Sequence, residues 1–81
     1  MSPTVLREHG FEFFFYSRES GEPPHIHVKK GGAAAKFWLT PVELAVEHGF
    51  NPNELRRLTA IVTEYEAYLR ESWHDHFSEG T

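Results

Sequence analysis

The chain has 81 residues, a formal net charge of −4 and 15% aromatic residues, which is enough for one small domain over residues 1–81. A chain of this size buries only about 60 to 65% of its unfolded surface, so it can form one modest core. The absence of cysteine excludes disulfide bonds and thiolate zinc sites. The acidic balance makes DNA an unexpected partner. No apolar run reaches the roughly 18 residues of a membrane span and no signal peptide is present, so we expect a cytoplasmic protein with no membrane partner.

A β-hairpin is expected near the N-terminus, because His9-Gly10 can form a two-residue turn. The register fixed by this turn pairs Arg7 with Glu12, Leu6 with Phe13, Val5 with Phe14 and Thr4 with Phe15. Leu6 and most of the phenylalanines then share one face. The opposite face carries the Arg7–Glu12 ion pair together with Val5, Phe14 and Tyr16.

A second hairpin is expected over residues 25–39, where HIHVKK and AAAKFWL flank Gly31-Gly32. The turn pairs Val28 with Ala35, Ile26 with Phe37, His27 with Lys36 and His25 with Trp38. One face is then apolar, and the other presents His25, His27, Lys29, Lys36 and Trp38.

Helix signals follow the strands. The segment Thr40-Pro41-Val42-Glu43 has the pattern of a capping box and predicts a short helix that ends at Gly49. Asn51 with Glu54 repeats the pattern and begins a long helix, expected from Pro52 to Phe77, with one apolar stripe. The predicted fold is α+β: a four-stranded antiparallel meander sheet of two hairpins, followed by the short helix and the long C-terminal helix packed on one sheet face.

Two histidines are the main candidates for a catalytic or phosphate-binding site. Residues two apart on a strand point the same way with Cα atoms about 6.6 Å apart, so His25 and His27 can act together on one phosphate or one ion. Imidazoles exchange protons near neutral pH, and Lys36 beside them would stabilise negative charge. These three residues are the candidate catalytic groups, and Trp38, Lys29 and Tyr16 are the candidate nucleic-acid contacts. The alternative is that the histidines are the ordinary polar side of a half-exposed strand.

Metal and DNA sites are weaker hypotheses. His74 or His76 could supply a third metal ligand, but residues two apart on a helix point about 200° apart and cannot both reach one ion. We therefore expect no metal and no cofactor. ELRRL after a turn is reminiscent of a recognition helix, but its neighbours are acidic and the helix is long.

Several segments together resemble a known family. They are PTVLREHGFEFFFYSRE, EPPHIHV, AKFWL, GF followed by ELRRL, and the final WHDHF. This combination, from Pro3 to Phe77, is similar to the bacterial domain-of-unknown-function family 4160. The resemblance implies a free-standing prokaryotic domain whose gene often neighbours a second short gene, in the manner of a toxin–antitoxin pair. Toxins of such pairs are frequently ribonucleases or other inhibitors of translation.

Two functions are therefore expected as alternatives. The first is a toxin-like protein that binds RNA or a nucleotide phosphate, or cleaves RNA without metal, through His25, His27 and Lys36. The second is a non-catalytic module that docks a small antitoxin-like partner protein through its aromatic sheet face or a free strand edge. In the second case Phe14, Tyr16 and Trp38 would matter more than the histidines.

Overall fold

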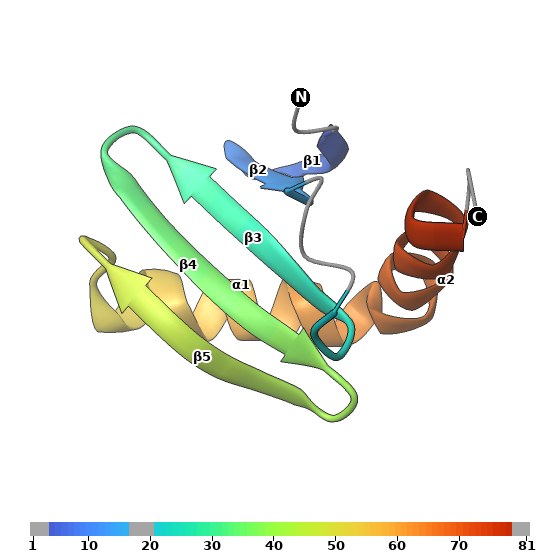
Figure 1. Ribbon diagram of the computed structural model, residues 1–81. Coiled ribbons are helices and arrows are strands. Elements are labelled where there is room, and N and C mark those ends of the chain that lie inside the picture. The colour runs from blue at the N-terminus through green and yellow to red at the C-terminus, as the bar shows by residue number, and fades with distance from the viewer. Residues whose placement is uncertain (1–3, 17–20, 79–81) are drawn as a thin grey trace.

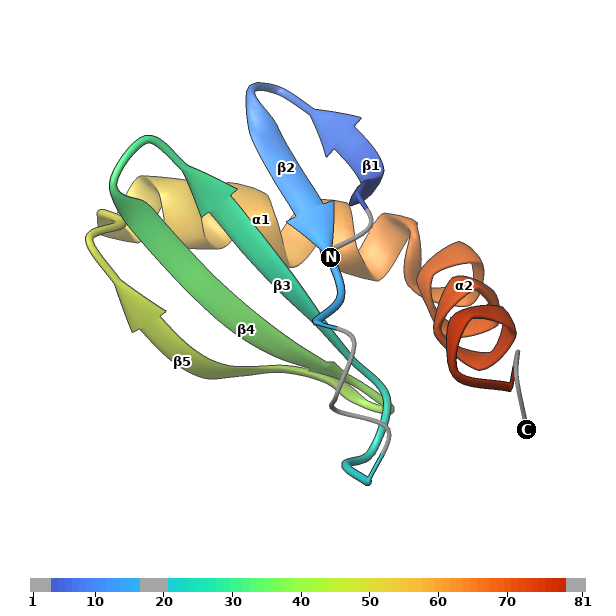
Figure 2. The same ribbon diagram turned by 45° about the horizontal axis from the view of Figure 1, so that its top comes forward.

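The computed structural model describes residues 4–16 and 21–78 of the chain. Five strands precede two helices (Figure 1): β1 Thr4–Glu8, β2 Phe11–Phe14, β3 His25–Lys30, β4 Ala33–Leu39, β5 Val42–His48, α1 Pro52–Glu64 and α2 Glu66–Ser78. The strands form one antiparallel meander in the order β1-β2-β3-β4-β5. The α+β class and the meander predicted from the sequence are confirmed. Figures 1 and 2 show α1 crossing one face of the sheet and α2 turning away at one end of it.

The second hairpin has the predicted register. Gly31-Gly32 turns the chain between β3 and β4, and the pairs include Val28 with Ala35, Ile26 with Phe37, His27 with Lys36 and His25 with Trp38. Gly31 adopts a left-handed φ of 59°, which a glycine tolerates without steric cost. The alternation of apolar and polar residues therefore fixed which side chains enter the core.

The first hairpin follows the prediction only near its turn. His9 and Gly10 have φ values of 52° and 83°, and Arg7 pairs with Glu12 as expected. Further along, Thr4 pairs with Phe14 rather than Phe15, because the register shifts between Thr4 and Leu6. The prediction that Val5 lies on the polar face was also wrong. A bulge re-aims a side chain, and Val5 packs against the hydrophobic core instead.

Residues 42–48 form a strand, not the short helix that was predicted. β5 pairs along β4, with Lys36 opposite Val46 and Trp38 opposite Glu43. Seven residues between Pro41 and Gly49 are too few for a helix to be stable on its own, whereas pairing satisfies the backbone along β4. An irregularity between Lys36 and Phe37 places Ala45 as the extra residue on β5. The sheet thus has five strands, not four.

The predicted long helix is interrupted at Tyr65, which separates α1 from α2. Its hydrogen-bond ladder continues through the junction, since Tyr65 N–H donates to Ile61 O at 3.0 Å and Leu69 N–H to Tyr65 O at 2.8 Å. The bend is supported by long-range contacts. The Tyr65 hydroxyl lies 3.1 Å from Glu8 Oε2, and the Tyr68 hydroxyl donates to Val5 O at 2.8 Å. Neither helix of the described residues is long and apolar enough to cross a membrane.

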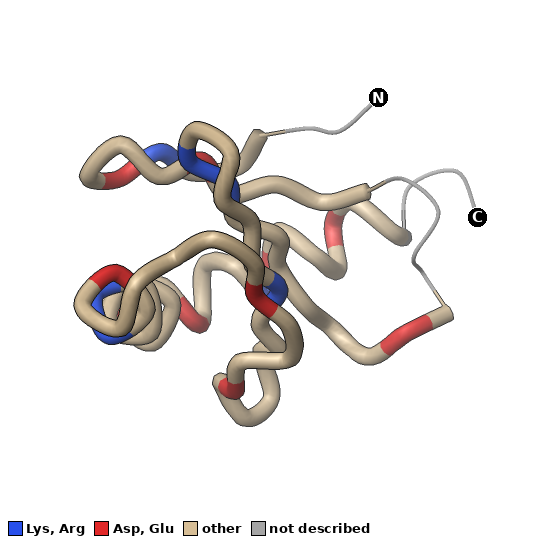
Figure 3. Tube along the Cα trace, turned by 90° about the vertical axis from the view of Figure 1, so that its left-hand side faces the viewer, with Lys and Arg blue, Asp and Glu red and all other residues tan. Residues whose placement is uncertain are grey.

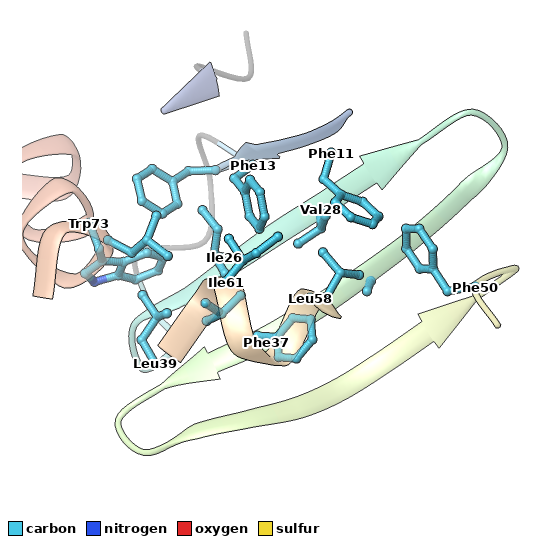
Figure 4. Close-up of a cluster of buried hydrophobic side chains, with 14 residues drawn as sticks. Phe11, Phe13, Ile26, Val28, Phe37, Leu39, Phe50, Leu58, Ile61 and Trp73 are labelled. Carbon is cyan, nitrogen blue, oxygen red and sulfur yellow. The ribbon is translucent and has the colours of Figure 1, made fainter. Parts of the chain in front are cut away.

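One hydrophobic core lies between the sheet and the helices (Figure 4). The predicted helix stripe supplies Leu58, Ile61, Val62, Leu69 and Trp73 to it. The inward residues of the strands, among them Phe13, Ile26, Val28, Phe37 and Leu39, are fully buried against that stripe. This core occupies one face of the sheet, and the opposite face is here called the outer face.

Candidate functional site on the outer face of the sheet

The outer face carries the polar half of the second hairpin. Alternation along β3, β4 and β5 and the observed pairings place rows of side chains on it. One row is Phe14, His27, Lys36 and Val46, and the next is Glu12, Lys29, Ala34 and His48. Of the predicted site residues, His27, Lys29, Lys36 and Trp38 share this face, and Tyr16 reaches it from the end of β2.

An aromatic cluster covers the β2–β3 part of the outer face. The ring of Phe14 stacks on His27 with centroids 5.6 Å apart, and Tyr16 meets His27 edge-on at 4.5 Å. The Lys29 ammonium lies 5.0 Å from the centre of the Phe14 ring. Tyr16 is 47% exposed, so one face of this cluster is available to a ligand ring. His27 is held by aromatic contacts on two sides and is half-buried.

His25 is on the same strand but in a different environment. Its side chain is fully buried, and its ring lies 4.7 Å from that of Trp73 and 5.7 Å from that of Trp38. The Nδ1–H group donates to the Pro23 carbonyl oxygen at 3.0 Å. The two histidine rings are close, with centroids 5.0 Å apart, but a ligand on the outer face would meet His27 before His25.

Lys36 is held by two neighbours. Its Nζ atom lies 2.5 Å from Glu22 Oε1 and 4.5 Å from the centre of the Trp38 ring. The Lys36 side chain is 18% exposed, and that of Glu22 is 39% exposed. Glu22 belongs to the EPPHIHV segment but was not predicted as a site residue, since a contact 14 positions away along the chain leaves no local signal.

A groove of about 280 Å³ opens between β3, β4 and β5. It is lined by His27, Ala34, Ala35, Lys36, Val46, Glu47 and His48. Three of these residues come from β5. They were not predicted as site residues, because a helix over 42–48 would not have lain beside Lys36.

Positively and negatively charged residues are interspersed along the chain (Figure 3). Figure 3 shows Lys and Arg positions as separate short segments of the trace with Asp and Glu positions among them, rather than as one continuous basic stripe. A hydrogen bond from Thr4 lowers the pKa of Glu12 below its usual value, and the positive charges of Lys29 and Arg7 act in the same direction against the effect of burial. Glu12 therefore stays ionised beside Lys29.

The remaining sequence hypotheses concern the C-terminal half. His74 is exposed, and His76 stacks on Phe15 with centroids 5.6 Å apart. Within residues 4–16 and 21–78, no group of three His, Asp, Glu or Cys side chains is arranged to hold a metal ion. A helix-turn-helix does not form before ELRRL, because the element before α1 is strand β5.

Comparison with known proteins agrees with this organisation. Residues 10–74 match the family described as domain of unknown function DUF4160. The chain belongs to the DUF4160 family. The match spans the β2–β5 part of the sheet and both helices up to His74, so the outer face and its groove lie inside the DUF4160 domain. A search among curated proteins finds no significant match, and neither does a search among solved structures.

Proposed function

We propose that this DUF4160 domain binds RNA or a nucleotide phosphate on the outer face of its sheet, as the toxin-like member of a gene pair. The observation that carries the proposal is the combination of ring faces and cations on one side of β3 and β4. His27, Tyr16 and Trp38 supply rings, and Lys29 and Lys36 supply positive charge. Single-stranded nucleic acids are bound by this chemistry, since bases stack on rings and phosphates pair with lysines.

His27 reaches the outer face, whereas His25 does not, so the two histidines do not act as an exposed pair. Cleavage through a substrate 2′-hydroxyl needs an acid and a base that both reach the reacting atoms. His25 is fully buried and donates its Nδ1–H to Pro23. We therefore propose binding as the primary activity. Cleavage that uses His25 would require the rings packed against it, those of Trp38 and Trp73, to move.

The test is a binding titration with a fluorescently labelled single-stranded RNA at several salt concentrations. Trp38→Ala should weaken binding by about 1–3 kcal/mol if a base stacks on the indole. Lys29→Gln should weaken binding for all RNA sequences and flatten its salt dependence. Tyr68→Phe, on α2 with its hydroxyl donating to Val5 O of β1, is an aromatic control away from β3 and β4 and should bind as the wild type does.

A second measurement addresses the toxin-like role. Expression of the wild-type chain should arrest growth and deplete cellular RNA if it cleaves, and arrest growth without RNA decay if it only binds. His27→Ala is the variant to compare, because it leaves the buried His25 in place. If the wild type binds no RNA at low salt, the proposal fails.

A second candidate function is favoured by one specific observation. Val46 is 62% exposed and Leu44 is 39% exposed, both on the edge strand β5. Exposed apolar side chains on an edge strand are a feature of protein-docking surfaces. Copurification of a small antitoxin-like partner that is lost on Trp38→Ala or Val46→Asp, but kept in His27→Ala, would favour docking over RNA binding.

A further inference from the structure

We propose that the groove over Ala34 binds the base of a single nucleotide, whose phosphate lies toward Lys29 on β3. This inference rests on the nucleotide binding proposed above and assigns the ligand class and its orientation. The proposed base site uses residues of β5 as well as of β3 and β4, among them the exposed His48.

The hollow arises from one small residue among long ones. Ala34 faces outward on β4, directly between Lys29 on β3 and His48 on β5. Side chains directly opposite each other across strands have Cβ atoms about 4.5–5.5 Å apart, so a methyl group between two long side chains leaves a depression. The groove of about 280 Å³ lies at this place.

The neighbouring row forms one wall of the groove. His27, Lys36 and Val46 lie side by side across the three strands, and all three line the groove. The Ala34 methyl and the Val46 side chain offer an apolar surface to the face of a flat ring. The exposed imidazole of His48 offers its nitrogen atoms to the edge of the ring. Apolar contact on the face with few polar groups at the edge is how proteins hold bases.

Size and charge select the ligand. Ligand sites usually span about 300–1,000 Å³, so a groove of about 280 Å³ has room for one ring system and not for a large ligand. Glu47 lines the groove, but its Oε2 atom accepts the Phe50 N–H at 3.3 Å and is directed toward the β5–α1 connection. Lys29 is exposed and pairs with Ala34 across β3 and β4, and its ammonium lies over the Phe14 ring, which favours an anionic group on the β2–β3 side of the groove.

A second copy of the chain is a less suitable occupant. If β5 paired with itself antiparallel around Ala45, Glu43 would lie opposite Glu47, and like charges directly opposite are destabilising. The bulge at Ala45 also interrupts the edge on which such a pair would form.

The experiment compares adenosine 5′-monophosphate with ribose 5-phosphate, which has the phosphate and sugar without the base. Both are titrated into the full chain while the imidazole resonances of His27 and His48 are followed by NMR. The first ligand should shift both histidines and bind roughly fivefold to a hundredfold more tightly than the second. Ala34→Leu fills the hollow and should reduce binding of adenosine 5′-monophosphate to the level of ribose 5-phosphate. Ala60→Leu, at an exposed position of α1, is the matched control and should change neither.

The outcomes separate the inference from the proposed function. Equal affinity for the two ligands, or full affinity of Ala34→Leu for adenosine 5′-monophosphate, overturns the base site while leaving phosphate binding on the outer face intact. No binding of either ligand, with RNA also unbound, overturns both. Histidine resonances that move with protein concentration alone would place a second copy in the groove and also overturn the inference. If Ala34→Leu does not fold, Ala34→Val and the histidine shifts of the wild type decide.

Discussion

Lys36 and Glu22 form a short ion pair, with 2.5 Å between Nζ and Oε1. The Glu22 carboxylate therefore already neutralises the ammonium group to which a phosphate would bind. A phosphate on the outer face must compete with this carboxylate. The pair is partly exposed, and such pairs contribute at most about 1 kcal/mol to stability.

Glu22→Gln should therefore tighten RNA binding. Removing the competing charge leaves Lys36 available, and a gain of up to about 1 kcal/mol corresponds to roughly fivefold in affinity. Lys36→Gln should change affinity in the opposite direction. The measurement is the same RNA titration, with Glu71→Gln on the exposed side of α2 as a control for net charge. An equal gain in both glutamate variants would mean that only net charge matters.

His25 and His27 should differ sharply when each is replaced by alanine. His25 is fully buried against Trp73 and bonded to Pro23, so His25→Ala leaves a cavity and an unpaired carbonyl and should destabilise the fold by about 3 kcal/mol. His27 is half-buried, and His27→Ala should cost about 1 kcal/mol. Urea unfolding of both variants measures the difference.

Similar losses for the two variants would contradict the expectation that burial makes His25 more important for stability than His27. The expected asymmetry also decides which variant can report on function. Lost activity in His25→Ala would follow from lost folding, whereas lost activity in His27→Ala would point to the outer face.

The second hairpin could be predicted from sequence because its determinants are local. Gly31-Gly32 sets the turn, and strict alternation on both sides sets the register, so the pairing of His27 with Lys36 follows without knowledge of the rest of the chain. The segment 42–48 also has a local signal, since a capping box predicts a helix there. Pairing with β4 outweighs that local preference. Without β5, strand β4 would be left with an unpaired edge.

The surroundings of the histidines depend on contacts that no local pattern encodes. His25 is buried because the chain bends at Tyr65 and carries Trp73 against it. That bend is supported by hydroxyl contacts of Tyr65 and Tyr68 to β1, 57 and 63 positions away in the sequence. A straight helix over the same stripe satisfies the sequence pattern equally well, and it would have left His25 on an open strand end.

Glu12 should make stability depend on pH in acid. The hydrogen bond from Thr4, then Lys29 and Arg7, lower its pKa from the ordinary 4.5, so the folded state favours the ionised carboxylate. A lowered pKa gives stability that is fully present above the unfolded-state pKa and is lost as the pH falls through the folded-state pKa. Glu12→Gln should therefore be less stable than the wild type at pH 7, and the difference should shrink below pH 4.5.

Urea unfolding of the wild type and Glu12→Gln at a series of pH values from 7 to below the Glu12 pKa checks this. Glu71→Gln serves again as the exposed control and should follow the wild type in acid. A stability difference between wild type and Glu12→Gln that does not change with pH would mean that the Thr4 contact stabilises the neutral carboxyl equally.

Gly49 joins the edge strand β5 to α1, and its replacement tests that connection. Its φ is +90°, and a Cβ built on it would lie 3.1 Å from the Cβ and 3.2 Å from the Cα of Ala33. Gly49→Ala should therefore cost about 1–3 kcal/mol, from the left-handed backbone and from displacement of Ala33 in the neighbouring strand. Gly32→Ala is the matched control, because a Cβ there would have no neighbour within 4 Å, and it should change stability by less than about 1 kcal/mol.

Urea unfolding measures the stability of both variants, and amide hydrogen exchange shows which residues become less protected. Because Gly49 directly follows β5 and lies close to Ala33 of β4, exchange in Gly49→Ala should increase first in Val42–His48 and the facing residues of β4. Faster exchange confined to α1 would instead indicate that Gly49 supports only the start of the helix. The groove depends on β5, so Gly49→Ala should also weaken nucleotide binding, whereas Gly32→Ala should leave binding unchanged.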